Sequence, residues 1–216
     1  MLRRPGIPAL LAVVLAASGC LQKETTHTLY LSPDGELRWV VDESGVHSDE
    51  SEVGRRIQEE QAYIGPALIG AHRIAQGLQA IGPDGLVRTT VVRDERPFHV
   101  VTDARFVRVD RAFDRLFAAC GIKAAVTLVQ EVGRSSLRMR FDFTREVEER
   151  ETPAMVLLED LERFRFVLTE GHFVAGGGFD VQDRTRAVIS REWMTNVEAA
   201  MSAGREVELT LVWDEG

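Results

Sequence analysis

Apolar and polar residues alternate along several short stretches of the chain, and this period of two predicts β-strands. The first two stretches, residues 27–31 and 36–41, flank Ser32-Pro33-Asp34-Gly35. Proline presets the backbone for a turn and glycine accepts a positive φ, so the segment predicts a hairpin. The buried face of this hairpin is expected to carry Leu29, Leu31, Leu37, Trp39 and Val41.

The same alternation recurs further along the chain. It predicts strands over residues 86–93, 98–109, 163–169, 172–174, 179–181 and 205–213, and a second hairpin of residues 122–132 and 136–145 around Gly133-Arg134. One face of that hairpin's second arm carries Leu137, Met139, Phe141 and Phe143, and the other carries Arg138, Arg140, Asp142 and Thr144. One face of the last strand carries Val207, Leu209, Leu211 and Trp213. We therefore expect Trp39, Phe141 and Leu209 in the core.

A spacing of three, four and seven residues predicts a helical segment over residues 52–80. Gly65-Pro66 interrupts this segment, so we expect two helices or one kinked helix. Residues 42–51 are acidic and rich in serine, and they predict a solvated loop that ends at an N-cap, Ser48 or Ser51. We interpret the apolar stripe as core, with a membrane-lying or partner-binding helix as the alternative. The stripe consists of Val53, Ile57, Ile64, Leu68, Ala71, Ala75 and Leu78.

Three further helices are predicted over residues 110–119, 153–161 and 190–202, the first capped by Asp110 and the last by Ser190. A charge run at residues 146–151 predicts a solvated loop or helix start. Glycines 176–178 lead into a strand-like segment and not into a helix, which favours a bulge or loop over a phosphate site. Pro-Asp-Gly occurs at residues 33–35 and 83–85, and whether this reflects a duplication stays open.

Paired strands separated by helices predict an α+β fold, with mainly antiparallel sheet from successive hairpins packed against several helices. We assign residues 27–216 to a single domain of this kind.

The first twenty residues follow a different pattern. Met1-Leu2-Arg3-Arg4 precedes an apolar stretch over residues 7–17, and small residues follow in Ala17-Ser18-Gly19-Cys20. Two basic residues, an apolar segment and a small-residue site are typical of a secretory signal. The last four residues resemble the lipobox of bacterial lipoproteins, although that family usually has leucine where this chain has Ala17. The resemblance implies cleavage before Cys20 and acylation of its thiol and of the new amino terminus.

On this resemblance, residues 1–19 are a lipoprotein signal peptide, residues 20–26 a lipidated tether, and Cys20 the lipidation site. The membrane would then be a partner through the anchor, and the protein would lie in the bacterial cell envelope. The residue after the cysteine is Leu21 and not aspartate. In enteric-type bacteria this resembles the lipoproteins that are sent to the outer membrane, where they face the periplasm. The other interpretation is a secreted protein that is cut after Gly19 and keeps Cys20 as a free thiol.

The net charge of the chain argues against two classes of binding partner. The chain has 26 basic and 34 acidic residues and a net charge of −8. Loss of residues 1–19 removes Arg3 and Arg4 and no acid, which leaves 24 basic against 34 acidic residues and a net charge of −10. An acidic body argues against nucleic acid and against electrostatic docking on anionic phospholipid. The only other cysteine, Cys120, lies on an apolar helix face and is predicted to be a buried thiol with a raised pKa.

The sequence carries no recognisable catalytic motif. Its five histidines lie in different predicted elements without metal-ligand spacing, and they are His27, His47, His72, His99 and His172. His47, near Asp49 and Glu50, fits a solvated acidic loop better than a site. We therefore assign no catalytic residue, metal or cofactor. The expected function is non-catalytic binding or a structural role with an envelope protein partner. The alternative is an anchored hydrolase or small-ligand-binding protein whose site is assembled only in the fold.

Overall fold

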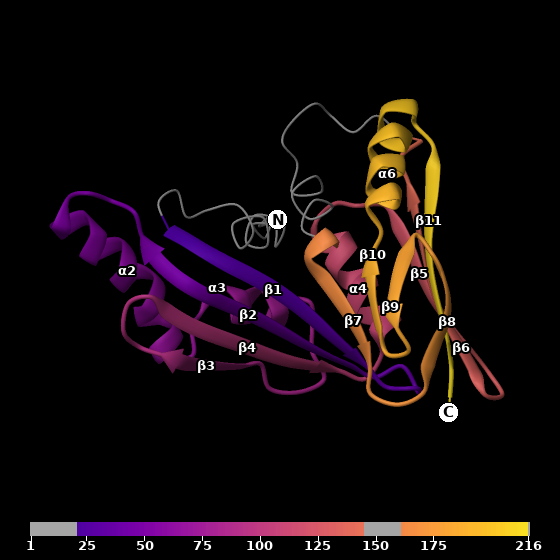
Figure 1. Ribbon diagram of the computed structural model, residues 1–216, viewed down its shortest axis with the longest axis horizontal. Coiled ribbons are helices and arrows are strands. Elements are labelled where there is room, and N and C mark those ends of the chain that lie inside the picture. The colour runs from indigo at the N-terminus through magenta and orange to yellow at the C-terminus, as the bar shows by residue number, and fades with distance from the viewer. Residues whose placement is uncertain (1–20, 145–160, 216) are drawn as a thin grey trace, which may run out of the picture.

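The computed structural model describes residues 21–144 and 161–215 of the 216-residue chain. The predicted signal peptide and Cys20 lie outside the described residues. So do the charge run at residues 146–151 and all but the last residue of the predicted helix 153–161. Two β-sheets, with helices packed on them, make up the described part (Figure 1).

The larger sheet has seven strands and begins with the predicted hairpin. In spatial order they are β3 (Arg88–Arg93), β4 (Phe98–Phe106), β2 (Leu37–Ser48), β1 (Leu21–Leu31), β7 (Phe164–Leu168), β10 (Arg186–Ile189) and β9 (Phe179–Asp183). Neighbouring strands are antiparallel except β1 and β7, which are parallel. The sequence pattern missed β10, which is only four residues long.

The smaller sheet has four strands, all antiparallel to their neighbours. They are β5 (Ala124–Glu131), β6 (Arg134–Asp142), β11 (Glu206–Asp214) and β8 (His172–Gly177), in this spatial order. β5 and β6 form the second predicted hairpin, and Leu137, Met139 and Phe141 are buried on one face of β6 as expected. The predicted α+β fold with mainly antiparallel sheet is therefore confirmed.

Helix α4 (Val109–Ala119) lies between the two sheets and joins their cores. The Phe113 ring stacks on Trp39 of the larger sheet at a centroid distance of 6.1 Å. One turn later, the Phe117 ring meets Phe141 of the smaller sheet edge-on at 5.1 Å. A single hydrophobic cluster therefore contains residues of both sheets, of α4, of α3 (Arg73–Ala80) and of α6 (Arg191–Ala203).

The predicted long helix consists of α2 (Val53–Leu68) and α3, and the break falls at residues 69–72. The prediction of a break at Gly65-Pro66 is wrong, because Pro66 lies inside α2. A proline this close to the helix end removes one donor, and Gly65 has no Cβ for the proline ring to meet. The chain turns instead at Gly70, whose φ is 72°.

The apolar stripe of α2 is only partly core. Ile64 and Ala67 pack in a second hydrophobic cluster at the end of the larger sheet, but Val53 and Ile57 are 56% and 47% exposed. Leu68 is exposed as well. The prediction that the whole stripe is core is therefore wrong.

Two segments predicted to lie outside the strands belong to the larger sheet. β1 begins at Leu21, so residues 21–26 are part of a strand and not a tether. They pair with residues 42–48 of β2, which the sequence pattern predicted to be a solvated loop. The acidic character of residues 42–51 suggested exposure. Glu43, however, is buried and finds polar partners in Lys23 and Tyr63, so the strands extend to Ser48.

The glycine run also differs from its prediction as a bulge or loop. Gly176 and Gly177 continue β8, and Gly178 connects β8 to β9 with a φ of 81°. A Cβ on Gly176 would lie 2.8 Å from the Cβ of Phe179, and a Cβ on Gly178 would lie 2.5 Å from Cδ1 of Trp193. The glycines therefore let the backbone pass close to two core aromatic side chains.

The helix caps agree with the prediction in one of three cases, since the N-cap of α2 is Glu52 and neither Ser48 nor Ser51. Ser190 caps α6, because its Oγ accepts a hydrogen bond from the Trp193 N–H at 3.1 Å. α4 instead has Arg108 as its N-cap, and Asp110 lies in the first turn and pairs with Arg108.

Cys120 follows the last residue of α4 and is 3% exposed. Burial raises the pKa of this thiol to about 11. The prediction of a buried thiol with a raised pKa is confirmed, and such a thiol is a poor nucleophile at neutral pH.

The buried side of β6 can be tested by comparing Phe141→Ala with Arg138→Ala. Phe141 is fully buried, so its truncation should lower the free energy of unfolding by about 3–5 kcal/mol. Arg138 lies on the other face, where it forms only an exposed ion pair with Glu208 at 3.3 Å, so its loss should cost about 0.5 kcal/mol or less. Urea unfolding of both variants measures the difference. Equal losses would contradict this assignment of the two faces.

Candidate functional site: a pocket with a cross-strand arginine pair

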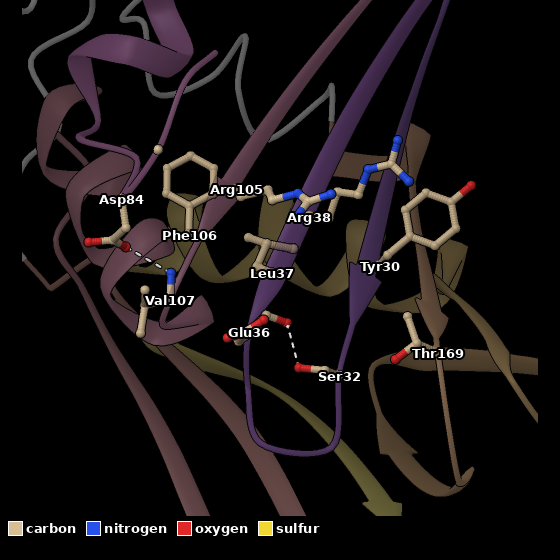
Figure 2. A pocket seen from close by; sticks show the side chains of 11 residues that line it. Tyr30, Ser32, Glu36, Leu37, Arg38, Asp84, Arg105, Phe106, Val107 and Thr169 are labelled. Carbon is tan, nitrogen blue, oxygen red and sulfur yellow. Dashed lines mark hydrogen bonds between the residues drawn. The ribbon is translucent and has the colours of Figure 1, made fainter. Parts of the chain in front are cut away.

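A pocket of about 410 Å³ lies beside the β1–β2 turn (Figure 2). Trp39 on β2 packs on α4, and because side chains alternate along a strand, Arg38 and its neighbours on that face point away from the helix. The pocket therefore reaches the outer face of the larger sheet. Its lining consists of Tyr30, Ser32, Glu36, Leu37, Arg38, Asp84, Gly85, Arg105, Phe106, Val107 and Thr169.

Arg38 of β2 and Arg105 of β4 are direct cross-strand partners, so their side chains leave the sheet on the same face. Figure 2 shows both side chains extended across the pocket between Phe106 and Tyr30. Asp103 accepts hydrogen bonds from Nε and Nη2 of Arg38 at 2.9 and 2.6 Å. These bonds raise the pKa of Arg38.

Arg105 has no ion pair or hydrogen bond to any side chain within residues 21–144 and 161–215. Like charges that face one another across two strands destabilise a sheet, and Asp103 pairs with only one of the two arginines. Among the described residues the sheet therefore holds an unpaired guanidinium at the pocket, next to a second one. Such a pair is suited to bind a carboxylate or a phosphate, which arginine recognises with two parallel hydrogen bonds.

The negative groups of the lining lie at its edges. Asp84 accepts a hydrogen bond from the backbone N–H of Val107 at 2.8 Å, and Glu36 lies where the β1–β2 turn enters β2. Figure 2 places both carboxylates away from the row that Arg38 and Arg105 form. The pocket is therefore positive in its middle and negative at its rim. That arrangement favours a ligand with a single anionic group.

The two aliphatic hydroxyl groups of the lining, those of Ser32 and Thr169, act as structural donors. Ser32 Oγ donates to Asp34 within the turn, and Thr169 Oγ1 donates to the carbonyl oxygen of Leu31 at 3.2 Å. The serine hydrogen bond lowers the pKa of Asp34, which makes this carboxylate a weaker base. The pair Ser32 and Asp34 is therefore poorly suited to nucleophilic catalysis, and the lining is better suited to binding.

A second cluster of polar side chains, centred on Glu43, is buried under α2 and α3. The Glu43 carboxylate pairs with Lys23 Nζ, accepts a hydrogen bond from the Tyr63 hydroxyl at 3.2 Å and lies 3.5 Å from His72 Nε2. Burial, together with the negative charge of Glu43, raises the pKa of Tyr63. Burial lowers the pKa of His72. These contacts hold α2 and α3 on the larger sheet, so we assign the cluster a structural role.

The histidines occupy separate places, and none of them lines the pocket. His99 lies 3.1 Å from Asp42 on the larger sheet, His47 contacts the backbone of its own strand, and His172 begins β8. Within the described parts of the chain, no three His, Cys, Asp or Glu side chains are grouped in a way that could hold a metal ion. The structure therefore does not bring together the histidines that the sequence analysis considered.

The sequence analysis did not identify the arginine pair, although part of the signal for it was present. The alternation over residues 98–109 puts Arg105 on the polar face of its strand, as the alternation over residues 36–41 does for Arg38. The two positions lie opposite each other because of the register between β2 and β4. These two strands are separated along the chain by α2, α3 and β3, so no local pattern gives their register. Cys20, the predicted lipidation site, lies outside the described residues.

No protein-family model matches this chain. No curated protein matches it either. Among solved structures, the chain is similar to the NMR structure of the folded domain of LppM from Mycobacterium tuberculosis, with 9% identity and a TM-score of 0.37. The similarity covers 93% of this chain and 94% of that one. At this TM-score the likeness carries no argument about function.

His27 is the one histidine inside the main core, and it is packed between aromatic rings. Its ring stacks on Phe164 at 4.8 Å, and its Nδ1 accepts a hydrogen bond from Trp39 Nε1 at 3.2 Å. Burial, with smaller contributions from Arg163 and Lys23, lowers the pKa of His27 from 6.5 to about 4. The folded protein therefore holds this imidazole neutral.

This histidine should make the protein less stable as the pH falls. Between pH 6.5 and about 4 the unfolded chain binds a proton at His27 that the folded chain does not, so the free energy of unfolding drops as pH falls through this window. From pH 7 to pH 5 the loss from this group should be about 2 kcal/mol. Urea unfolding at both pH values measures the loss, and His27→Gln should reduce it by that amount. An unchanged pH dependence in the variant would contradict a neutral, buried His27.

Proposed function

We propose that this protein is a non-catalytic, lipid-anchored binding protein of the bacterial cell envelope. The anchor is supported by the segment Ala17-Ser18-Gly19-Cys20 behind a short apolar stretch. No helix within the described residues is long and apolar enough to cross a membrane. Leu21 after the cysteine supports the outer membrane, facing the periplasm, as the location.

The cross-strand pair Arg38 and Arg105 in the pocket is the observation that carries the binding role. A pocket of about 410 Å³ is in the range of small-molecule sites. Its ligand carries one carboxylate or phosphate, which the two guanidinium groups bind, and presents an apolar or aromatic part to Tyr30 and Phe106. Such an anionic group could belong to a small molecule or to the end of an envelope protein partner.

The alternative of an anchored hydrolase has less support. A hydrolase needs a nucleophile next to a base of suitable pKa, and the pocket's own serine donates to a carboxylate whose pKa is lowered. The buried thiol of Cys120, with its raised pKa, belongs to the core cluster instead of the pocket.

The anchor is tested by Cys20→Ser in the full chain, expressed in bacteria. Acylation needs the thiol, so the variant should lose both the lipid mass and the cleavage before residue 20, and its membrane retention should change, while the unaltered chain should carry acyl groups on Cys20. Mass spectrometry of the purified protein and fractionation of the envelope measure both effects. An unmodified Cys20 in the unaltered chain would contradict the lipoprotein assignment.

The pocket is tested by Arg105→Gln, with inorganic phosphate as the probe. The variant should bind phosphate at least tenfold more weakly, because one of the two guanidinium groups is gone. It should also raise the free energy of unfolding by about 0.2–1 kcal/mol, because the like-charge pair is relieved. NMR titration and urea unfolding of the chain without residues 1–19 measure the two effects.

Arg165→Gln is the matched control. Arg165 is an exposed arginine on β7 of the same sheet and does not line the pocket, so its loss should leave phosphate binding unchanged. Equal weakening by both variants would mean that general surface charge, and not the pocket, attracts the anion.

A further inference from the structure

The anchoring residue is joined directly to a rigid part of the fold. Leu21, which follows Cys20 in the chain, is already paired with Ser48 in the larger sheet and packs against the second hydrophobic cluster. Consecutive Cα atoms lie about 3.8 Å apart, so a lipid on Cys20 would have no spacer between it and the sheet. Whichever surface surrounds Leu21 must then lie at the membrane.

Helix α2 is part of that surface. In Figure 1 the N-terminal half of α2 extends past the ends of β1 and β2, at the end of the long axis where β1 begins. Val53 and Ile57 are spaced four residues apart, and Ile57 is seven residues before the buried Ile64, so all three share one face of the helix. Only Ile64 has the sheet beneath it, which explains why the other two are exposed.

Polar contacts fix this helix to the start of β1. Ser48, the partner of Leu21, donates its backbone N–H to Glu60 at 3.1 Å, and its Oγ donates to Glu59 of the same helix. Arg96 pairs with Glu60 at 2.9 Å and donates to the carbonyl oxygen of Ser48 at 3.0 Å. The helix and the strand end therefore move as one unit.

We propose that the exposed apolar face of α2, formed by Val53 and Ile57, rests in the lipid interface of the membrane that holds Cys20. The inference rests on the proposed acylation of Cys20. Arg55, on the same turns, pairs with Glu52 at 3.0 Å, and the chain as a whole is acidic, so the contact is apolar and does not depend on anionic lipid. Because the acyl anchor would already hold this amphipathic helix at the membrane, the contact requires only that the apolar face turn toward the lipid.

The test uses the full, acylated chain with Ile57→Cys, labelled with the fluorophore NBD. Acylated Cys20 is blocked and Cys120 is buried, so the thiol reagent reacts at position 57. The control is Val132→Cys, in the fully exposed turn between β5 and β6 of the smaller sheet. Both proteins are placed in phosphatidylcholine vesicles with and without lipids that carry a quenching spin label in the upper part of the acyl chain.

The label at position 57 should lose most of its fluorescence to the spin-labelled lipid, several-fold more than the label at position 132. Equal and weak quenching at both positions would overturn the proposal. The unlipidated form, made without residues 1–19 and with Cys20→Ser, should in buffer give the emission of a water-exposed label at position 57. An apolar emission there would mean that a second copy or another part of the chain covers this face, which would also overturn it.

Mass spectrometry of the same samples separates this inference from the proposed function. Acylated protein with no quenching at position 57 refutes the membrane contact of α2 alone. Protein without acyl groups refutes the anchor and, with it, the basis of the inference.

Discussion

The packing of α4 between the two sheets is the contact on which the rest of the fold depends. Phe113 and Phe117 are both fully buried, and their rings meet Trp39 on one side and Phe141 on the other. Aromatic side chains bury large areas, and each pair in contact adds about 0.5–1.5 kcal/mol beyond that burial. α3 and α6 cover other parts of these faces, but without α4 the aromatic contacts that join the two sheets would be lost, and the described part of the chain could not form one main core.

The coverage of the inner face leaves the outer face of the larger sheet available for polar chemistry. Arg38 and Arg105 can face one another there because neither needs to fit beside α4, and Asp103 satisfies one of them. Buried cross-strand arginines without partners would be very costly, whereas partly exposed ones cost only a fraction of that. The fold thus tolerates an unfavourable pair at the surface, which is common where a protein binds something.

The sequence predicted those parts of the fold in which local pattern and tertiary environment agree. The hairpins, the Ser190 cap and the burial of Phe141 and Leu209 follow from alternation and turn chemistry. The prediction of a solvated loop over residues 42–48 failed, because the buried partners of Glu43 come from β1, α2 and α3. No local pattern in the sequence reveals these partners. The arginine pair could not be predicted for the same reason, since it depends on a register between distant strands.

The correction at residues 21–26 changes how the protein would work in the envelope. A flexible tether would let the domain take any orientation, whereas a strand that starts at Leu21 would fix one end of the fold at the proposed anchor on Cys20. The pocket lies beside the turn at the other end of the same hairpin. With about 3.3 Å per residue, the length of β1 puts roughly 33 Å between anchor and pocket. One rigid hairpin would thus set the height at which Arg38 and Arg105 meet the proposed ligand, so inserting flexible residues between Cys20 and Leu21 would free the orientation without altering the pocket.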